Sequence, residues 1–380
     1  MRISSALAVL AGLGIATFLF FATGPAAVMG LLFDAGYGIA ILVAFHFVQI
    51  LFDALAWRAL LEAATRPPLG MFMVLRWIRE AINNLLPVAQ VGGEVVGARL
   101  LSLFAVGAPE AAASTVIDLT SEMLSQVVFT AIGIAVLLSF EPRSAPLWQA
   151  ATYALIGLSA LGLGFVAAQW AGLFWVVEQV LLRIGRRLGW QSLEEAAGLH
   201  RAVIEVWRAP KAVLACGALH LASWLLGGLE VMLACHYLGH DVSLWQAIVL
   251  ESLSQAMKSA GFAIPGGLGV QEGGLLLLAP LCGLPAENAM ALTLLKRLRE
   301  MVLGVPALIA WHPNTRIRTI SIVVPILTFV QMILPGTGRW GAALHPVNAI
   351  LILGMYLWLF LTLRKAAPET ETEPATVPTG

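Results

Sequence analysis

The chain has 380 residues, of which 59% are hydrophobic and 12% are charged. Soluble domains carry about a quarter charged residues, so this chain has too little polar surface to cover itself in water. Its 22 basic and 22 acidic residues balance, which excludes the overall positive field of a nucleic-acid-binding protein. The composition therefore predicts an all-α integral membrane protein that crosses the bilayer several times.

Eight apolar stretches are long enough, or nearly long enough, to cross the hydrocarbon core, which takes about 20 helical residues. In chain order they are Ala6–Ala22, Tyr37–Trp57, Ala111–Phe140, Leu147–Ala168, Val213–Leu238, Ala289–Trp311, Ile317–Leu334 and Val347–Leu363. The first exceeds the apolar region of a cleaved signal peptide, so it is predicted to remain as a helix. Residues 366–380, rich in Pro, Thr and Glu, are predicted to form a disordered tail.

Two further apolar stretches, Leu69–Phe104 and Leu244–Cys282, are interrupted near their middle. The interruptions read NNLLPVAQVGGE and FAIPGGLGVQEGG. Proline removes a backbone donor and glycine loosens a helix, so each stretch is predicted to form two half-helices joined by a bend. Half-helices are too short to cross the bilayer, and such backbone is tolerated only inside protein or beside water. We therefore expect two re-entrant helical hairpins.

The orientation follows from the distribution of cations between the spans. The most basic loop runs from Arg183 to Lys211, and it is predicted to face the cytoplasm. Counting outward from it places both termini in the cytoplasm and leaves Arg143 and Arg339 in outer loops. Within the linker of residues 172–212, the segment Gln191–Trp207 is predicted to form an amphipathic helix at the membrane interface.

A shift of 178 positions superimposes the two interrupted stretches. The shift aligns Pro87 with Pro265, Glu94 with Glu272, Thr115 with Thr293, and Glu122 with Glu300. The predicted topology inserts the first hairpin from the cytoplasm and the second from outside. Residues 37–168 and 213–334 are therefore predicted to be inverted repeats, an architecture that many secondary transporters use. The alternative is a coincidence within a low-complexity apolar sequence.

Ionisable residues are frequent in these apolar stretches. Such groups are costly in lipid, so they face a cavity, a partner or a substrate path. We predict a charged groove lined by Arg79, Asn83, Asn84, Pro87, Gly93, Glu94, Arg99, Asp118, Glu122, Lys258, Pro265, Gly266, Gly267, Gly269, Gln271, Glu272, Arg297 and Glu300. The alternative for each charge is an internal ion pair that fastens one helix to another.

The two bends also suggest which headgroups the groove suits. Half-helices that begin after Pro87 and Pro265 would direct partial positive charge inward, which suits an anionic phosphate. Arg79, Arg99 and Arg297 could add bidentate contacts to the same phosphate.

No cofactor or metal is expected from the sequence. The chain has no Walker motif, nucleophile elbow or HExxH motif, and the GGLG of the second interruption is not followed by GK[ST]. The three cysteines show no CxxC spacing. His236 and His240 are four residues apart and precede Asp241, but ordinary interfacial histidines explain this spacing better than a metal site.

Two passages resemble the paired signatures of the lysylphosphatidylglycerol synthase transmembrane (flippase-like) family. They are REAINNLLPVAQVGGEVVGARLL and FAIPGGLGVQEGG, the latter followed by GLPAENAMALTLLKRLRE. The chain length and the Gly-Gly-Glu sequence of the first passage resemble most closely the hopanoid-associated HpnL branch, a bacterial inner-membrane group. The family's best-known enzymes add a soluble aminoacyl-transferase domain, and no such domain follows here, so lysyl transfer is not expected.

The resemblance implies a lipid translocase that moves a polar-headed lipid through the charged groove, and its hopanoid-associated branch implies a hopanoid-related lipid. One alternative is an integral-membrane enzyme or accessory factor of lipid or hopanoid biosynthesis, with Glu94 and Glu272 as acid and base. Another is a scaffold for biosynthetic enzymes. The expected partners are a membrane lipid and lipid-biosynthetic enzymes, with no nucleic acid.

Overall fold

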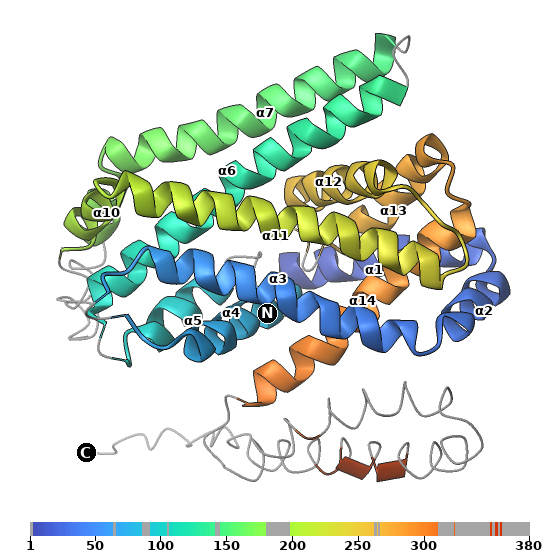
Figure 1. Cartoon of the computed structure of the whole chain (residues 1–380), viewed down its shortest axis with the longest axis horizontal. Helices are drawn as coiled ribbons and strands as arrows, with labels where there is room; N and C mark the ends of the chain where they lie inside the picture. Colours follow the sequence, from blue (N-terminus) through green and yellow to red (C-terminus); the bar gives the residue numbers. More distant parts are fainter. Residues whose placement is uncertain are drawn as a thin grey trace, which may run out of the picture. The chain divides into compact units, whose positions relative to one another are not determined.

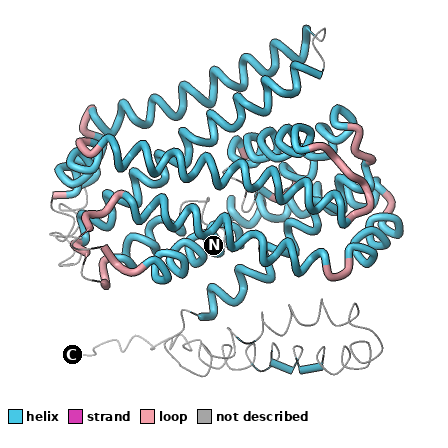
Figure 2. Tube along the Cα trace, in the orientation of Figure 1, coloured by secondary structure: helices cyan, strands magenta, loops and turns pink. Residues whose placement is uncertain are grey.

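The computed structural model describes residues 3–63, 66–85, 92–104, 106–140, 145–179, 198–261, 264 and 267–310, and the single positions 323, 350, 351, 354, 355 and 358. The chain divides into two units, Met1–Leu308 and Ile309–Gly380. Throughout the described residues the regular elements are helices, so the predicted all-α class is confirmed (Figure 2). Two predicted spans, Ile317–Leu334 and Val347–Leu363, and the predicted tail lie almost wholly outside these residues.

The helices described up to residue 310 are labelled in Figure 1. Their bounds are α1 Ile3–Thr23, α2 Pro25–Ala35, α3 Gly38–Ala59, α4 Leu69–Leu85, α5 Gly92–Leu101, α6 Ala108–Phe140, α7 Ala145–Trp170, α10 Leu199–Trp207, α11 Pro210–Tyr237, α12 Leu244–Ala260, α13 Val270–Leu278, a 3₁₀ turn at Ala279–Cys282, and α14 Ala286–Ala310.

Helices α3, α6 and α11 are long and apolar enough to cross a membrane, and two bent pairs raise the number to five among the described residues. The first pair is α1 with α2, which meet at 90°. Gly24 permits this bend because its φ of 94° suits glycine, and Pro25 begins the next helix. The second pair is α7 with Leu173–Gln179. The structure thus contains several apolar helices, while the predicted number of eight spans stays a prediction.

Both interrupted stretches form two helices separated by a break, as the sequence predicts. Helix α4 lies against α5, and α12 lies against α13. Glycine makes the first contact possible: a Cβ added to Gly97 would lie 2.6 Å from Cδ of Arg79. The tips of both bends, residues 86–91 and 262–266 apart from Ile264, lie outside the described residues.

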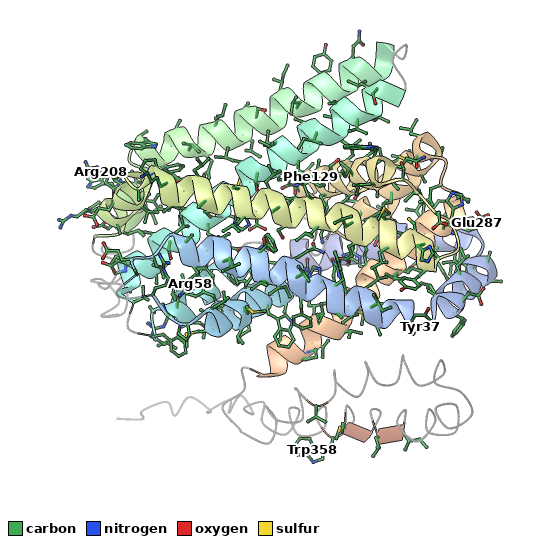
Figure 3. All side chains as sticks on the ribbon, viewed as in Figure 1. Tyr37, Arg58, Phe129, Arg208, Glu287 and Trp358 are labelled. Atoms are coloured by element: carbon green, nitrogen blue, oxygen red, sulfur yellow. The ribbon has the colours of Figure 1, made fainter. Side chains whose placement is uncertain are left out.

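The order of a long helix, a broken pair and a second long helix occurs twice, as α3 to α6 and as α11 to α14. Helices α3 and α11 lie side by side along the middle of the unit, with α6 and α12 also packed on α11 (Figure 1). Basic Arg58 and Arg208 mark one end of this pair, and Tyr37 and Glu287 mark the other (Figure 3). The predicted repeat units, residues 37–168 and 213–334, extend beyond this repeated order, and both the units and their inverted relation stay a prediction.

The predicted amphipathic segment Gln191–Trp207 is described only from residue 198 onward. There the chain forms α10, whose buried residues Leu199, Ala202 and Val203 pack toward α6. The described part of this segment therefore covers the end of the helical core.

Candidate functional site

A cavity of about 600 Å³ lies among the helices of the first unit. Its lining divides by helix. Helix α4 contributes only charged or amide side chains, which are Arg76, Arg79, Glu80, Asn83 and Asn84. Helix α7 contributes only apolar groups, which are Leu161, Gly162 and Phe165. The cavity therefore offers a charged side and an apolar side to one occupant.

Five side chains from α4, α5 and α6 form the arginine cluster: Arg76, Arg79, Glu94, Asp118 and Glu122. Arg76 donates from both terminal nitrogens to the Glu122 carboxylate, at 2.9 and 2.6 Å. Arg79 donates to Asp118 at 2.7 Å and to Glu94 at 3.3 Å. Bidentate and shared contacts of this kind fix a guanidinium in one orientation.

Asn83 joins the end of α4 to the start of α5. Its Oδ1 accepts from the Gly93 N–H at 2.8 Å, and its Nδ2 donates to both Glu94 oxygens at 3.1 Å. The amide therefore satisfies an N–H of the first turn that would otherwise lack a partner. Glu94, in that first turn, also lies favourably with respect to the helix dipole.

Four side chains from α12, α13 and α14 form the lysine cluster: Lys258, Glu272, Arg297 and Glu300. Glu300 accepts from Lys258 at 3.1 Å and from Arg297 at 3.0 Å. Arg297 also donates from Nε to Glu272 at 2.9 Å, and the second Glu272 oxygen accepts from the Gly269 N–H at 2.7 Å. Glu272 thus stands in the first turn of α13, as Glu94 does in α5.

The two clusters meet at the cavity. Lys258 donates to Asn84 Oδ1 at 3.3 Å, which links the first broken pair to the second. Gln126 of α6 donates to Ser259 of α12 at 2.8 Å, across the same space. Residues far apart in the sequence therefore close one polar network.

Two histidines each bridge two carboxylates. The His46 bridge places Nδ1 of His46 3.2 Å from Glu230 and Nε2 2.8 Å from Glu80. The His220 bridge places Nδ1 of His220 3.0 Å from Asp53 and Nε2 2.9 Å from Asp118. Together the bridges connect α3 and α11 to each other and to α4 and α6.

Asp118, Cys216 and His220 each bring one potential ligand atom within 4.8 Å of the others. Hydrogen bonding already explains this arrangement, because His220 contacts one Asp118 oxygen and Arg79 contacts the other. A divalent cation there would meet the Arg79 guanidinium on the same carboxylate. We therefore interpret the group as part of the polar network.

The predicted groove residues fall into three sets. Those that line the cavity are Arg79, Asn83, Asn84, Glu94, Glu122, Lys258 and Glu300. Those joined to them by hydrogen bonds or by a close backbone approach are Gly93, Asp118, Gly267, Gly269, Glu272 and Arg297. Gln271 is buried outside the lining, Arg99 is exposed, and Pro87, Pro265 and Gly266 lie outside the described residues.

At each of the two bends, one backbone N–H is already bonded to a side chain. The Gly93 N–H is bonded to Asn83, and the Gly269 N–H is bonded to Glu272. These two N–H groups are therefore not free to bind a phosphate, and whether the half-helix N-termini bind one stays a prediction.

Sequence reasoning missed four polar residues of the central helices: His46, Gln49 and Asp53 of α3, and His220 of α11. The first three line the cavity, and His220 is fully buried beside it. The available signal was an ionisable or amide group inside an otherwise apolar span. The same signal predicts Asp118, Glu122, Arg297 and Glu300 in other spans, and the four missed residues carry it as well.

These features define a polytopic helical membrane protein with a charged internal cavity. The sequence model of the family described as "Lysylphosphatidylglycerol synthase TM region" matches residues 5–307. The chain belongs to this family, which the motifs around the two bends had suggested. No curated protein and no solved structure gives a significant match to the chain.

Proposed function

We propose that the protein is a lipid translocase, in which a polar headgroup passes through the cavity while the acyl chains stay in the bilayer. The observation that carries this proposal is the division of the cavity into a charged side on α4 and an apolar side on α7. An amphiphile matches such a lining, whereas a fully polar solute would leave the apolar side unused. Membrane lipids are amphiphiles of this kind, and they surround any membrane protein.

The energetic problem of translocation is the loss of water around the headgroup. Moving an ionised group into hydrocarbon without partners is strongly unfavourable, and fixed charges and dipoles can replace the water. A volume of about 600 Å³ lies within the range of small-ligand pockets, so it suits a headgroup-sized molecule. The network therefore serves as a substitute for the hydration shell.

Unused donors indicate which headgroups fit best. Arg76, Arg79 and Arg299 line the cavity, and the Nε of each is buried without a hydrogen-bond partner among the described residues. Buried donors are normally satisfied, and an acceptor-rich group such as a phosphate supplies what they lack. We therefore propose a phosphate-bearing headgroup as the favoured cargo.

The resemblance to the hopanoid-associated branch supports a hopanoid-related lipid as a more specific cargo. It also supports a bacterial inner membrane as the location, and the basic loop from Arg183 to Lys211 supports both termini lying in the cytoplasm. An integral-membrane enzyme or accessory factor of lipid biosynthesis, and a scaffold for such enzymes, are the competing functions.

Purified protein in liposomes with lipids labelled in one leaflet separates these functions. Movement of the label without chemical change supports translocation, and a new lipid species supports an enzyme. If the lipid neither moves nor changes chemically, the result supports a scaffold. Arg76→Lys keeps the charge but removes Nε and the bidentate contact, so it should slow the movement of a phosphate lipid at least about tenfold. Arg208→Lys, at an exposed position, is the matched control and should match the wild type.

A further inference from the structure

We propose that the His46 bridge and the His220 bridge bind and release the protons that drive translocation. The inference rests on the proposed function and adds the source of its energy. Each bridge consists of one imidazole between two carboxylates: Glu80–His46–Glu230 and Asp53–His220–Asp118.

Counting hydrogens shows why each bridge holds an extra proton. A neutral imidazole has one N–H and can donate one hydrogen bond, while its other nitrogen can only accept. Both ring nitrogens of each histidine lie within 3.2 Å of a carboxylate oxygen. The second contact needs a second hydrogen, which sits either on the imidazole or on a carboxyl group. Each bridge therefore holds one proton more than a neutral imidazole with two carboxylates.

The charges around the His46 bridge make this proton removable without unfolding the site. Glu230 also accepts from Arg299 of α14 and from Gln49 of α3. With the proton bound, the two carboxylates, Arg299 and the imidazolium sum to zero. Lys296 of α14 and Arg76 of α4 also act on these carboxylates, and they are paired with Glu251 and Glu122. Loss of the proton leaves one uncompensated negative charge, which the cation of a passing headgroup or a returning proton can neutralise.

The His220 bridge is held from four helices. Asp53 of α3 lies 3.3 Å from Arg76, and Asp118 of α6 lies 2.7 Å from Arg79 and 3.6 Å from Arg76, both of α4. Cys216, one turn before His220 on α11, lies 3.8 Å from Asp118. The carboxylates keep their arginine partners when the proton leaves, so the change falls on the histidine contacts.

The position of the bridges connects the proton to the shape of the cavity. His46 on α3 holds α4 and α11, and His220 on α11 holds α3 and α6. Removing one proton removes one of the two hydrogen bonds of a bridge, which releases one helix contact beside the cavity. His46, Glu80 and Asp53 line the cavity, so protons can reach both bridges from it.

Proteoliposomes with a difference of one pH unit across the membrane test the coupling. If one proton moves with each lipid, the labelled lipid should become roughly tenfold more abundant in one leaflet than in the other. A protonophore should return this ratio of the two leaflets to one. His220→Gln should abolish the pH-driven ratio. His236→Gln, which alters an exposed histidine bonded to Asp241, is the matched control and should keep it.

Rapid equilibration of the lipid to a ratio of one despite the pH difference would overturn proton coupling and leave translocation standing. Absence of any lipid movement would instead contradict the proposed function. A second measurement decides the proton sites in the purified protein without lipid movement: nitrogen NMR for imidazolium and infrared spectroscopy for protonated carboxyls. We expect two signals of an imidazolium or a protonated carboxyl group, one of which is lost in His46→Gln and the other in His220→Gln. Neutral imidazole with ionised carboxylates at both bridges would overturn the proposal.

Discussion

At the scale of single residues, shared carboxylates decide how the charged interior is built. Asp118 is fully buried and takes hydrogen bonds from Arg79 and His220 on opposite oxygens. Glu300 likewise serves both Lys258 and Arg297. Buried pairs add little stability relative to a well-packed apolar core, but breaking one is costly. The consequence of a substitution therefore depends on whether the remaining charges keep another partner.

Glu94→Gln and Glu272→Gln should leave the fold nearly intact and abolish lipid movement. Arg79 keeps Asp118 in the first variant and Arg297 keeps Glu300 in the second, so neither leaves a bare cation. We expect normal membrane levels and a loss of about 1 kcal/mol in the free energy of unfolding. Wild-type movement in both variants, or a defect limited to loss of folded protein, would show that the two carboxylates are only structural.

Asp118→Asn should behave differently. It removes one charge that Arg79 and His220 share at a fully buried position, so both lose a contact at once, and Arg79 keeps only the longer contact to Glu94 while His220 keeps only Asp53. We expect a destabilisation of about 3–5 kcal/mol, measured by thermal unfolding in detergent. Glu110→Gln, at an exposed position of the same helix, should unfold at the wild-type temperature. An unchanged midpoint for Asp118→Asn would contradict the role given to this carboxylate.

At the scale of helices, proline and glycine made the two broken pairs predictable, because both residues disrupt a helix locally. The bend between α1 and α2 carries the same signal, Gly24 followed by Pro25, but the apolar pattern predicts a single span there, Ala6–Ala22, and no bend after it. The partners of His46 and His220 could not be predicted. They are up to 184 residues away, and the packing of α3 and α11 on each other and on α4 and α6 brings them together.

Gly97→Leu tests whether the first broken pair must pack closely. The new side chain would collide with Arg79 and approach Trp57, so α5 should separate from α4. We expect the protein to reach the membrane, because the change raises hydropathy, and lipid movement to be lost. Gly164→Leu on α7, where an added Cβ meets no described atom within 4 Å, is the control and should move lipid normally. Equal lipid movement by both variants would show that close packing of α5 on α4 is not needed for translocation.

At the scale of the whole molecule, the α3–α11 pair has one end marked by Arg58 and Arg208 (Figure 3). Cations collect on the cytoplasmic side of membrane proteins, so this end is predicted to face the cytoplasm. A cysteine placed at Gln191, outside the described residues, should resist an impermeant reagent, and one placed at His240 should react from outside. Cys216, Cys235 and Cys282 are buried, which keeps the background low. Labelling of the Gln191 position from outside would overturn the topology and the inverted repeat.

Photo-crosslinking of lipids to the reconstituted protein is the most direct test of the cavity as the headgroup's path. One phospholipid carries the reactive group on its headgroup, and a second carries it near the start of an acyl chain. The headgroup probe should react with the polar side of the cavity, at Asn84 and Lys258, and the chain probe should react with the apolar side, at Leu161 and Phe165. Headgroup crosslinks confined to exposed residues outside the cavity, with none on α4 or α12, would contradict the account.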